Sequence, residues 1–191
     1  IIKREHYLKQ LIAGQHNGLI KIITGLRRSG KSYLLFKLYA DYLKNNGISD
    51  NHIIKIDLED RRNAVLRNPD KLLSYIDSRM IDDKMYYILL DEVQYVPEFE
   101  DVLNSYLKID NADVYVTGSN SKFLSSDIIT EFRGRGDQIH VYPLSFAEFM
   151  SVRKDHPSDA WREYYTFGGL PHVLALETSN KKIEYLKEIY S

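Results

Sequence analysis

One short segment constrains the fold of this chain more than any other. Residues 25–32 match the pattern G-x-x-x-x-G-K-[ST] in full, and they read Gly25-Leu26-Arg27-Arg28-Ser29-Gly30-Lys31-Ser32. The segment follows an apolar run at residues 19–24 and precedes an amphipathic run at residues 32–43. A strand, a glycine-containing turn and a helix N-terminus in this order direct several backbone N–H groups into one concavity. The sequence therefore predicts a phosphate-binding loop at the first strand-to-helix connection.

The residues of this loop have different expected roles. The Lys31 ammonium can reach the β- and γ-phosphates of a nucleotide, and the Ser32 hydroxyl can bind Mg²⁺. We interpret the Arg27 and Arg28 side chains as solvated charge beside an anionic ligand. The position of a residue in the loop pattern does not determine the direction in which its side chain points. The residues expected to bind the nucleotide are Gly25, Arg28, Ser29, Gly30, Lys31, Ser32 and Tyr33.

Apolar runs rich in β-branched residues alternate with helical patterns along the chain. Strands are predicted at residues 19–24, 52–58, 85–91, 113–117 and 138–142. Helices are predicted at residues 32–43, 69–80 and 98–109. This alternation indicates an α/β fold in which right-handed crossovers connect a five-stranded parallel sheet covered on both faces. The continuous apolar run 86–90 favours a central strand.

The pattern changes after about residue 142. Pro143 ends the last strand, and Ser145 and Glu148 have the spacing of a capping box. Helical stretches follow near residues 159–167 and 171–177. We therefore expect residues 1–142 to form the core and residues 143–191 to form part of a small helical lid. Because the helical spacing at the end of the chain has no cap, we expect the sequence to be a fragment of a longer protein.

Two carboxylates stand at the end of the third predicted strand. Asp91 and Glu92 come directly after the apolar run, and ligands of parallel sheets bind at the carboxyl ends of the strands. Asp91 is suited to hold Mg²⁺, and Glu92 is suited to deprotonate a water that attacks the γ-phosphate. A solvated strand end is the alternative, which the preceding phosphate loop makes less favourable.

Two later segments offer further polar groups. Ser119 or Asn120 could sense the γ-phosphate, although a capped turn explains them equally well, and Thr117 can still belong to the fourth strand. Arg133 and Arg135 could stabilise transition-state charge in their own chain or in a neighbouring subunit. A solvated basic loop is the slightly favoured alternative for these arginines.

The composition excludes several classes of protein. The chain has 26 Lys and Arg against 27 Asp and Glu, and this net charge of −1 does not fit a polybasic tail protein. The absence of cysteine excludes a disulfide scaffold and any thiolate metal site. No apolar run is long enough for a transmembrane helix, so a cytoplasmic location is expected. No Asn-Lys-x-Asp segment for guanine recognition is present, which favours ATP over GTP.

Several of these segments together resemble the bacterial and archaeal P-loop ATPases known as predicted AAA+ superfamily ATPases, which are AAA-like and STAND-related. The resemblance rests on residues 23–32, 89–94 and 116–121, on Gly134-Arg135 followed by residues 142–149, and on the turn Gly168-Gly169-Leu170-Pro171. It implies an additional-strand ATPase core, in which the strand ending in Asp91 is not adjacent to the strand before the phosphate loop. It also implies that Ser119 occupies a sensor position, that Arg135 belongs to a Gly-Arg motif, and that a C-terminal domain of unknown function usually follows.

The sequence thus predicts an ATP-binding P-loop ATPase that hydrolyses ATP with Mg²⁺ to drive a conformational change. The expected catalytic residues are Lys31, Glu92, Ser119 and Arg135, and the expected metal ligands are Ser32 and Asp91. Two alternatives stay open: an ATP-dependent switch or scaffold with negligible turnover, and a nucleic-acid-associated motor or clamp. The expected partners are ATP or ADP, a protein or nucleic acid bound through a further C-terminal region, and a second copy of the chain.

Overall fold

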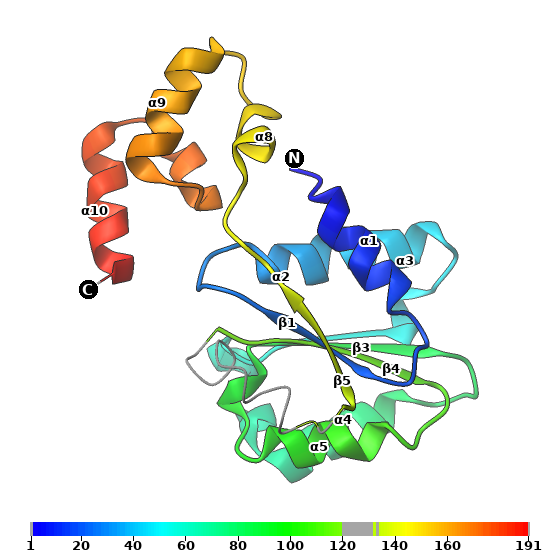
Figure 1. Cartoon of the computed structure of the whole chain (residues 1–191). Helices are drawn as coiled ribbons and strands as arrows, with labels where there is room; N and C mark the ends of the chain where they lie inside the picture. Colours follow the sequence, from blue (N-terminus) through cyan, green and yellow to red (C-terminus); the bar gives the residue numbers. More distant parts are fainter. Residues whose placement is uncertain (1, 120–131, 133, 191) are drawn as a thin grey trace.

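The computed structural model describes residues 2–119, 132 and 134–190 of the chain. At its centre, the described residues form a five-stranded sheet in the order β2-β3-β4-β1-β5 (Figure 1). All strand pairs are parallel. The strands are β1 (Ile20–Thr24), β2 (Ile53–Asp57), β3 (Tyr86–Asp91), β4 (Ala112–Thr117) and β5 (Gly136–His140). The predicted α/β class and five-stranded parallel sheet are confirmed.

The strand order places the functional segments at one edge of the sheet. Strand β4 lies between β1, which leads into the phosphate loop, and β3, which ends in Asp91. The arrangement implied by the family resemblance is therefore observed. Because the strands are parallel, the loop after β1 and the carboxylates after β3 lie at the same edge, with the end of β4 between them.

Helices cover both faces of the sheet (Figure 1). One face carries α1 (Glu5–Ala13) and a continuous helix made of α2 (Lys31–Tyr33), the π-helical η1 (Leu34–Tyr39) and α3 (Ala40–Asn45). The other face carries α4 (Pro69–Arg79) and α5 (Phe99–Tyr106). Short 3-10 segments lie in the connections: η2 (Asp50–His52), η3 (Arg61–Arg67) and η4 (Val93–Tyr95). Helix α1 precedes the first predicted strand and was not expected.

Strand β3 shows how the sequence produces these layers. Its side chains alternate between the two faces, so Tyr86 and Ile88 join the cluster under α4 and α5, whereas Tyr87 and Leu89 join the cluster under α1 and η1. Every residue of the strand is buried, as the continuous apolar run predicts. The two apolar clusters therefore fix β3, and with it the position of the carboxylates that follow.

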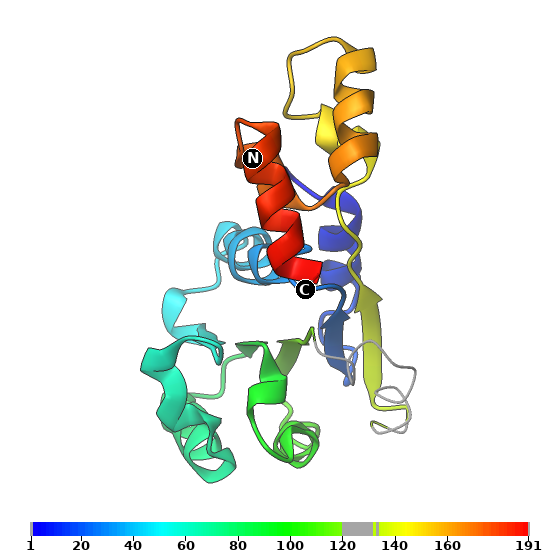
Figure 2. The ribbon, with the colours of Figure 1, turned by 90° about the vertical axis from the view of Figure 1, so that its left-hand side faces the viewer.

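Residues 144–190, here called the helical segment, extend away from the sheet after β5 (Figure 2). The segment contains α8 (Phe146–Met150), α9 (Pro157–Phe167), the 3-10 turn η5 (Pro171–Ala175) and α10 (Ser179–Tyr190). The predicted capping box is present at the start of α8. The helix expected at residues 171–177 is instead a 3-10 turn, because Leu176 leaves helical geometry (φ −93°, ψ 121°) before α10 begins.

Two contacts stabilise the helical segment internally. The Leu144 N–H donates to the Gly169 carbonyl at 2.6 Å, and a Cβ at Gly169 would lie 2.2 Å from the Leu144 carbonyl oxygen. Only glycine fits this close approach of two backbones. In addition, the Trp161 ring packs edge-on against the Phe146 ring, with 5.0 Å between centroids.

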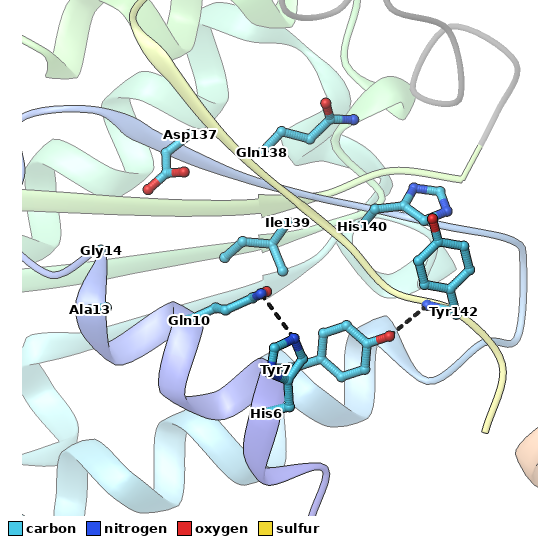
Figure 3. A pocket seen from close by; sticks show the side chains of 10 residues that line it. All are labelled: His6, Tyr7, Gln10, Ala13, Gly14, Asp137, Gln138, Ile139, His140 and Tyr142. Carbon is cyan, nitrogen blue, oxygen red and sulfur yellow. Dashed lines mark hydrogen bonds between the residues drawn. The ribbon is translucent and has the colours of Figure 1, made fainter. Parts of the chain in front are cut away.

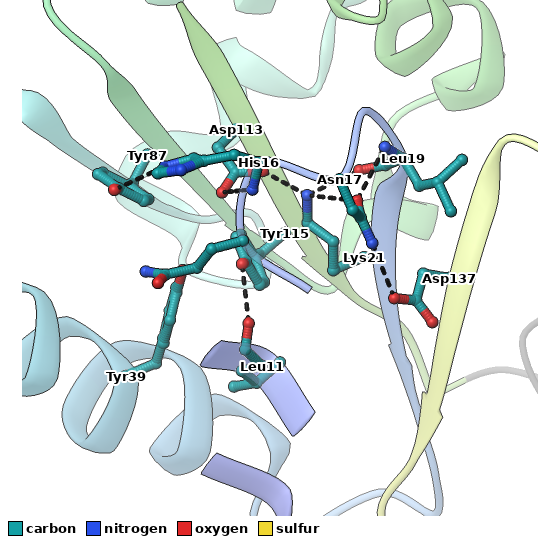
Figure 4. A network of polar contacts seen from close by, with 11 residues as sticks. Leu11, His16, Asn17, Leu19, Lys21, Tyr39, Tyr87, Asp113, Tyr115 and Asp137 are labelled. Atoms are coloured by element: carbon teal, nitrogen blue, oxygen red, sulfur yellow. Dashed lines mark hydrogen bonds and ion pairs between the residues drawn. The ribbon is translucent and has the colours of Figure 1, made fainter. Parts of the chain in front are cut away.

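A buried ion pair lies at the opposite edge of the sheet from the phosphate loop (Figure 4). The Lys21 ammonium pairs with the Asp113 carboxylate, and both side chains are almost completely buried. Asp113 also accepts a hydrogen bond from the His16 N–H at 3.2 Å, and the ammonium lies 4.7 Å from the centre of the Tyr115 ring. Burial lowers the pKa of Lys21, and the charge of Asp113 opposes that change.

Replacing Lys21 with methionine is expected to destabilise the fold strongly. The substitution would leave the Asp113 carboxylate buried without its cation, which costs about 3–5 kcal/mol in comparable pairs. The double variant Lys21→Met/Asp113→Leu removes both charges and should lose less stability than the single variant. Urea unfolding followed by circular dichroism measures both. A loss under about 1 kcal/mol in the single variant would contradict this account of the pair.

Candidate nucleotide-binding site

The phosphate loop depends on its two glycines. Gly25 has φ +143° and Gly30 has φ +100°, which are conformations that other residues adopt only with strain. A Cβ at Gly25 would also lie 2.2 Å from the Val141 carbonyl oxygen. Between the glycines, the Ser29 side chain is buried, and its hydroxyl has no hydrogen-bond partner among the described residues. The loop therefore holds a buried polar group that a ligand could engage.

Lys31 brings a positive charge to the mouth of the loop. Its ammonium donates to the Gly25 carbonyl at 3.1 Å and to the Leu26 carbonyl at 3.0 Å, and it lies 3.9 Å from Oε1 of Glu92. Burial lowers the pKa of Lys31, and the nearby carboxylates of Glu92 and Asp91 oppose this change. The sheet thus brings the predicted lysine and the predicted general base close to each other.

The Thr117 hydroxyl at the end of β4 connects Asp91 and Glu92, the two acidic residues at the end of β3. It donates to Oδ1 of Asp91 at 2.6 Å and accepts a hydrogen bond from the Glu92 N–H at 2.9 Å. The Ser119 hydroxyl donates to Oε2 of Glu92 at 2.6 Å, and the Gln94 side-chain amide donates to the same oxygen. Both of these hydrogen bonds use Oε2 of Glu92, whereas Oε1 faces the Lys31 ammonium.

Asp91 is a buried carboxylate with a shifted pKa. Burial raises its pKa to about 6, while hydrogen bonds from the Thr117 and Ser32 hydroxyls act in the opposite direction. The hydrogen bond between Ser32 and Asp91 shows that the two predicted metal ligands are neighbours. A hydroxyl and a carboxylate are hard oxygen donors of the kind that Mg²⁺ prefers, and a bound cation would offset the cost of burying this charge. The residues present therefore fit the metal.

The remaining loop residues lie around this centre. The Arg28 guanidinium lies 5.2 Å from the centre of the Tyr185 ring on α10, and Arg27 forms an exposed ion pair with Glu59. Tyr33 follows Ser32 on the first helical turn and is exposed. The side chain of Arg27 therefore lies in solvent, as the sequence analysis expects. The side chain of Arg28 instead contacts the helical segment.

The structure separates Arg135 from the phosphate loop. The Ile20 N–H donates to the Arg135 carbonyl at 2.9 Å, so Arg135 lies beside the first residue of β1, whereas the loop follows the last. Five residues of strand span about 16 Å. Of the two options left open by the sequence, action within its own chain does not fit this geometry. Asn120 and Arg133 lie outside the described residues.

Two residues of the site were missed from the sequence. The sequence pattern places Thr117 within the fourth strand, and no pattern marks Gln94. Thr117 does end β4, yet its hydroxyl contacts both carboxylate-bearing residues. A hydroxyl residue at the last position of a strand, next to a strand that ends in Asp-Glu, is the signal that could have identified it.

The fold and this site are those of a P-loop protein of the AAA class. The sequence matches the AAA domain family over residues 17–150, and the chain belongs to that family. Membership implies that the chain binds nucleotide. Every helix in the described part of the chain is too short or too polar to span a lipid bilayer.

The chain is also similar to individual proteins and solved structures. An uncharacterized protein of Haemophilus influenzae is 35% identical over 188 residues, which are 95% of this chain and 47% of that protein. The chain thus spans less than half the length of this relative. Among solved structures, the Walker-type ATPase PABY2304 of Pyrococcus abyssi has a TM-score of 0.65 at 17% identity, covering 98% of this chain and 68% of that one. AMPPCP-bound DnaA from Aquifex aeolicus has a TM-score of 0.60 at 14% identity, covering 97% and 61%.

Proposed function

We propose that this chain binds ATP with Mg²⁺ and hydrolyses it, and that hydrolysis repositions the helical segment as a lid. The observation that supports this most directly is the grouping of Lys31, Asp91, Glu92 and Ser119 at one edge of the sheet, where Thr117 hydrogen-bonds to Asp91 and Glu92. A site built only to bind phosphate does not need a second carboxylate held by its own hydrogen bonds. The Glu92 carboxylate is such a group, and it therefore favours hydrolysis over binding alone.

The residues divide the chemistry between them. The loop N–H groups and the Lys31 ammonium bind the phosphates. Ser32 and Asp91 would hold Mg²⁺, which supplies charge neutralisation to the phosphate oxygens. Ser119 and Gln94 both donate to Oε2 of Glu92, so Oε1 is the oxygen free of these donors to accept the proton of the attacking water.

Contacts between the loop and the helical segment support the proposed lid. The Arg28 guanidinium lies over the Tyr185 ring of α10. A Cβ at Gly30 would lie 3.8 Å from Cγ of Pro171 in η5. Because two loop residues lie against the segment, a ligand that changes the loop would change the surface on which the segment rests.

Arg135 belongs to this proposal only through a second copy of the chain. Its position at the amino end of β5 leaves it beside Gly18 and Asp101, on a surface away from its own phosphate loop. We therefore place it, in the proposal, against the nucleotide of a neighbouring subunit, where it would stabilise transition-state charge.

The cytoplasmic location and the partner bound through a further C-terminal region stay predictions from the sequence.

Metal removal tests the proposal on the unaltered chain. Calorimetric titration with ATP should show binding in the presence of Mg²⁺, and EDTA should weaken that binding at least tenfold because no metal ion would then lie between Asp91 and the phosphates. Phosphate release should stop in EDTA. No binding at millimolar ATP would contradict the proposal, and tight binding without phosphate release would favour the switch with negligible turnover.

A further inference from the structure

Arg4 is a buried arginine outside the residues assigned so far. It lies directly before α1, is 4% exposed, and has a left-handed backbone conformation with φ 45°. A residue with a side chain adopts this conformation only when its surroundings hold it there. The contacts of Arg4 are therefore strong enough to offset both its burial and its backbone strain.

The guanidinium uses each of its three nitrogens on a different part of the chain. Nη1 donates to the Ser29 carbonyl in the phosphate loop at 2.7 Å. Nη2 donates to the carbonyl of Tyr142, which links β5 to the helical segment, at 2.7 Å. Nε donates to Oε1 of Glu148 in α8 at 3.1 Å. The Arg4 side chain thus connects the phosphate loop, the segment that follows β5 and the first helix of the helical segment.

Tyr7 completes the attachment of Tyr142. The Tyr7 hydroxyl accepts a hydrogen bond from the Tyr142 N–H at 3.1 Å (Figure 3), and the Tyr7 ring lies 4.6 Å from the Arg4 guanidinium carbon. Both backbone polar groups of Tyr142 are therefore bound by side chains from the start of α1. The direction in which the chain leaves the sheet is fixed by these two side chains.

The contact with Ser29 also acts on the anion-binding side of the loop. The Ser29 carbonyl and the Gly30 N–H belong to one peptide unit, and because that peptide is trans, they point in opposite directions. A charged donor on the carbonyl polarises the unit and makes its N–H a stronger donor. It also fixes the plane of the peptide, so that the Gly30 N–H faces away from Arg4.

We propose that Arg4 is a positioning residue of the nucleotide site. It orients and polarises the Ser29–Gly30 peptide for a phosphate, and through Tyr142 and Glu148 it links the state of the loop to the orientation of the helical segment. The first part rests on the proposed function, since it needs a nucleotide in the loop. The second part concerns the chain alone and is measurable without a nucleotide.

Three substitutions test these contacts separately, and a fourth is the control. Arg4→Gln removes the charge and the three-way contact, whereas Tyr7→Phe removes only the hydroxyl that binds Tyr142. Glu148→Gln removes the charge that faces Arg4 but keeps the capping box, which accepts Gln as well as Glu. Lys3→Gln is the matched control, because Lys3 is the neighbouring cation and is exposed.

Nucleotide affinity and the position of the helical segment are measured separately. Calorimetry with Mg²⁺ and ATP gives the affinity. The chain contains no cysteine, so cysteines introduced at Ile81 and Tyr165, which are both 81% exposed, can be spin-labelled to give a distance distribution between sheet and helical segment. Arg4→Gln should weaken ATP binding at least tenfold and broaden the distance distribution. Tyr7→Phe and Glu148→Gln should broaden the distribution while changing the affinity less than threefold, and Lys3→Gln should change neither.

Two results would overturn the proposal: wild-type affinity in Arg4→Gln, or a wild-type distance distribution in all three test variants. If Arg4→Gln fails to fold, Tyr7→Phe and Glu148→Gln provide the distance test. Arg4→Lys then provides the affinity test, because a single nitrogen replaces the three guanidinium nitrogens that each donate to a different acceptor. A wild-type chain that binds no ATP would contradict the proposed function and the loop part of this inference. The distances in the nucleotide-free chain would still decide whether Arg4 holds the helical segment.

Discussion

Alanine at position 31 is expected to abolish ATP binding at working concentrations. Lys31 carries the buried positive charge at the mouth of the loop, where its ammonium lies against the Gly25 and Leu26 carbonyls. Without it, the phosphates would face the Asp91 and Glu92 carboxylates with no compensating cation from the protein. We expect a loss of at least about 100-fold in affinity, which corresponds to about 2.7 kcal/mol.

Calorimetric titration of ATP into the wild-type and Lys31→Ala chains measures this loss. Lys37→Ala is the matched control, because Lys37 is on the same helix and its ammonium is half-exposed in a surface ion pair with Asp41. The control should bind ATP within about twofold of the wild-type chain, since surface pairs contribute little. Affinity within threefold of wild type in Lys31→Ala would remove the loop from the proposed site.

Replacing Glu92 with glutamine is expected to stop hydrolysis while leaving ATP binding intact. The amide oxygen of glutamine can still accept the hydrogen bond of Ser119, so the local geometry should persist. Glutamine cannot take a proton from water, and losing a general base lowers the rate by about 10²–10⁴-fold. The expected signature is therefore an unchanged dissociation constant for ATP with a much lower rate of phosphate release.

Single-turnover phosphate release, with binding measured on the same samples, tests this expectation. Glu98→Gln serves as the control, since Glu98 is exposed on the same stretch of chain and should have wild-type turnover. Unchanged hydrolysis in Glu92→Gln would reject Glu92 as the base. Loss of binding together with turnover would assign Glu92 to holding Lys31, which lies 3.9 Å from its carboxylate, rather than to activating water.

Local patterns made the sheet and the loop predictable. The loop has a complete sequence pattern, and the run that forms β3 is apolar throughout because both of its faces are buried. Strand β5 was predicted two residues late because Val141 and Tyr142 have strand-like side chains. In the structure Tyr142 is instead bound through its backbone by Arg4 and Tyr7. The residue types alone could not show that strand pairing ends before Tyr142 and that contacts with Arg4 and Tyr7 replace it.

The unpredicted parts of the site depend on contacts between distant residues. The role of Thr117 follows from β4 lying beside β3, which is a property of strand order rather than of the sequence around Thr117. Arg4 reaches acceptors 25, 138 and 144 residues away, and no local pattern marks it. Helix α1 begins without a side-chain cap, so its start also lacked a signal.

The packing of Trp161 against Phe146 gives the chain a built-in optical probe. The sequence contains one tryptophan, and it lies in α9 of the helical segment, whereas the sheet is rich in tyrosine. Emission excited at the red edge of the absorption band would therefore report on the helical segment alone. Far-ultraviolet dichroism would report on the whole backbone. Comparing the two signals during one denaturant titration would reveal whether the segment melts with the sheet or ahead of it.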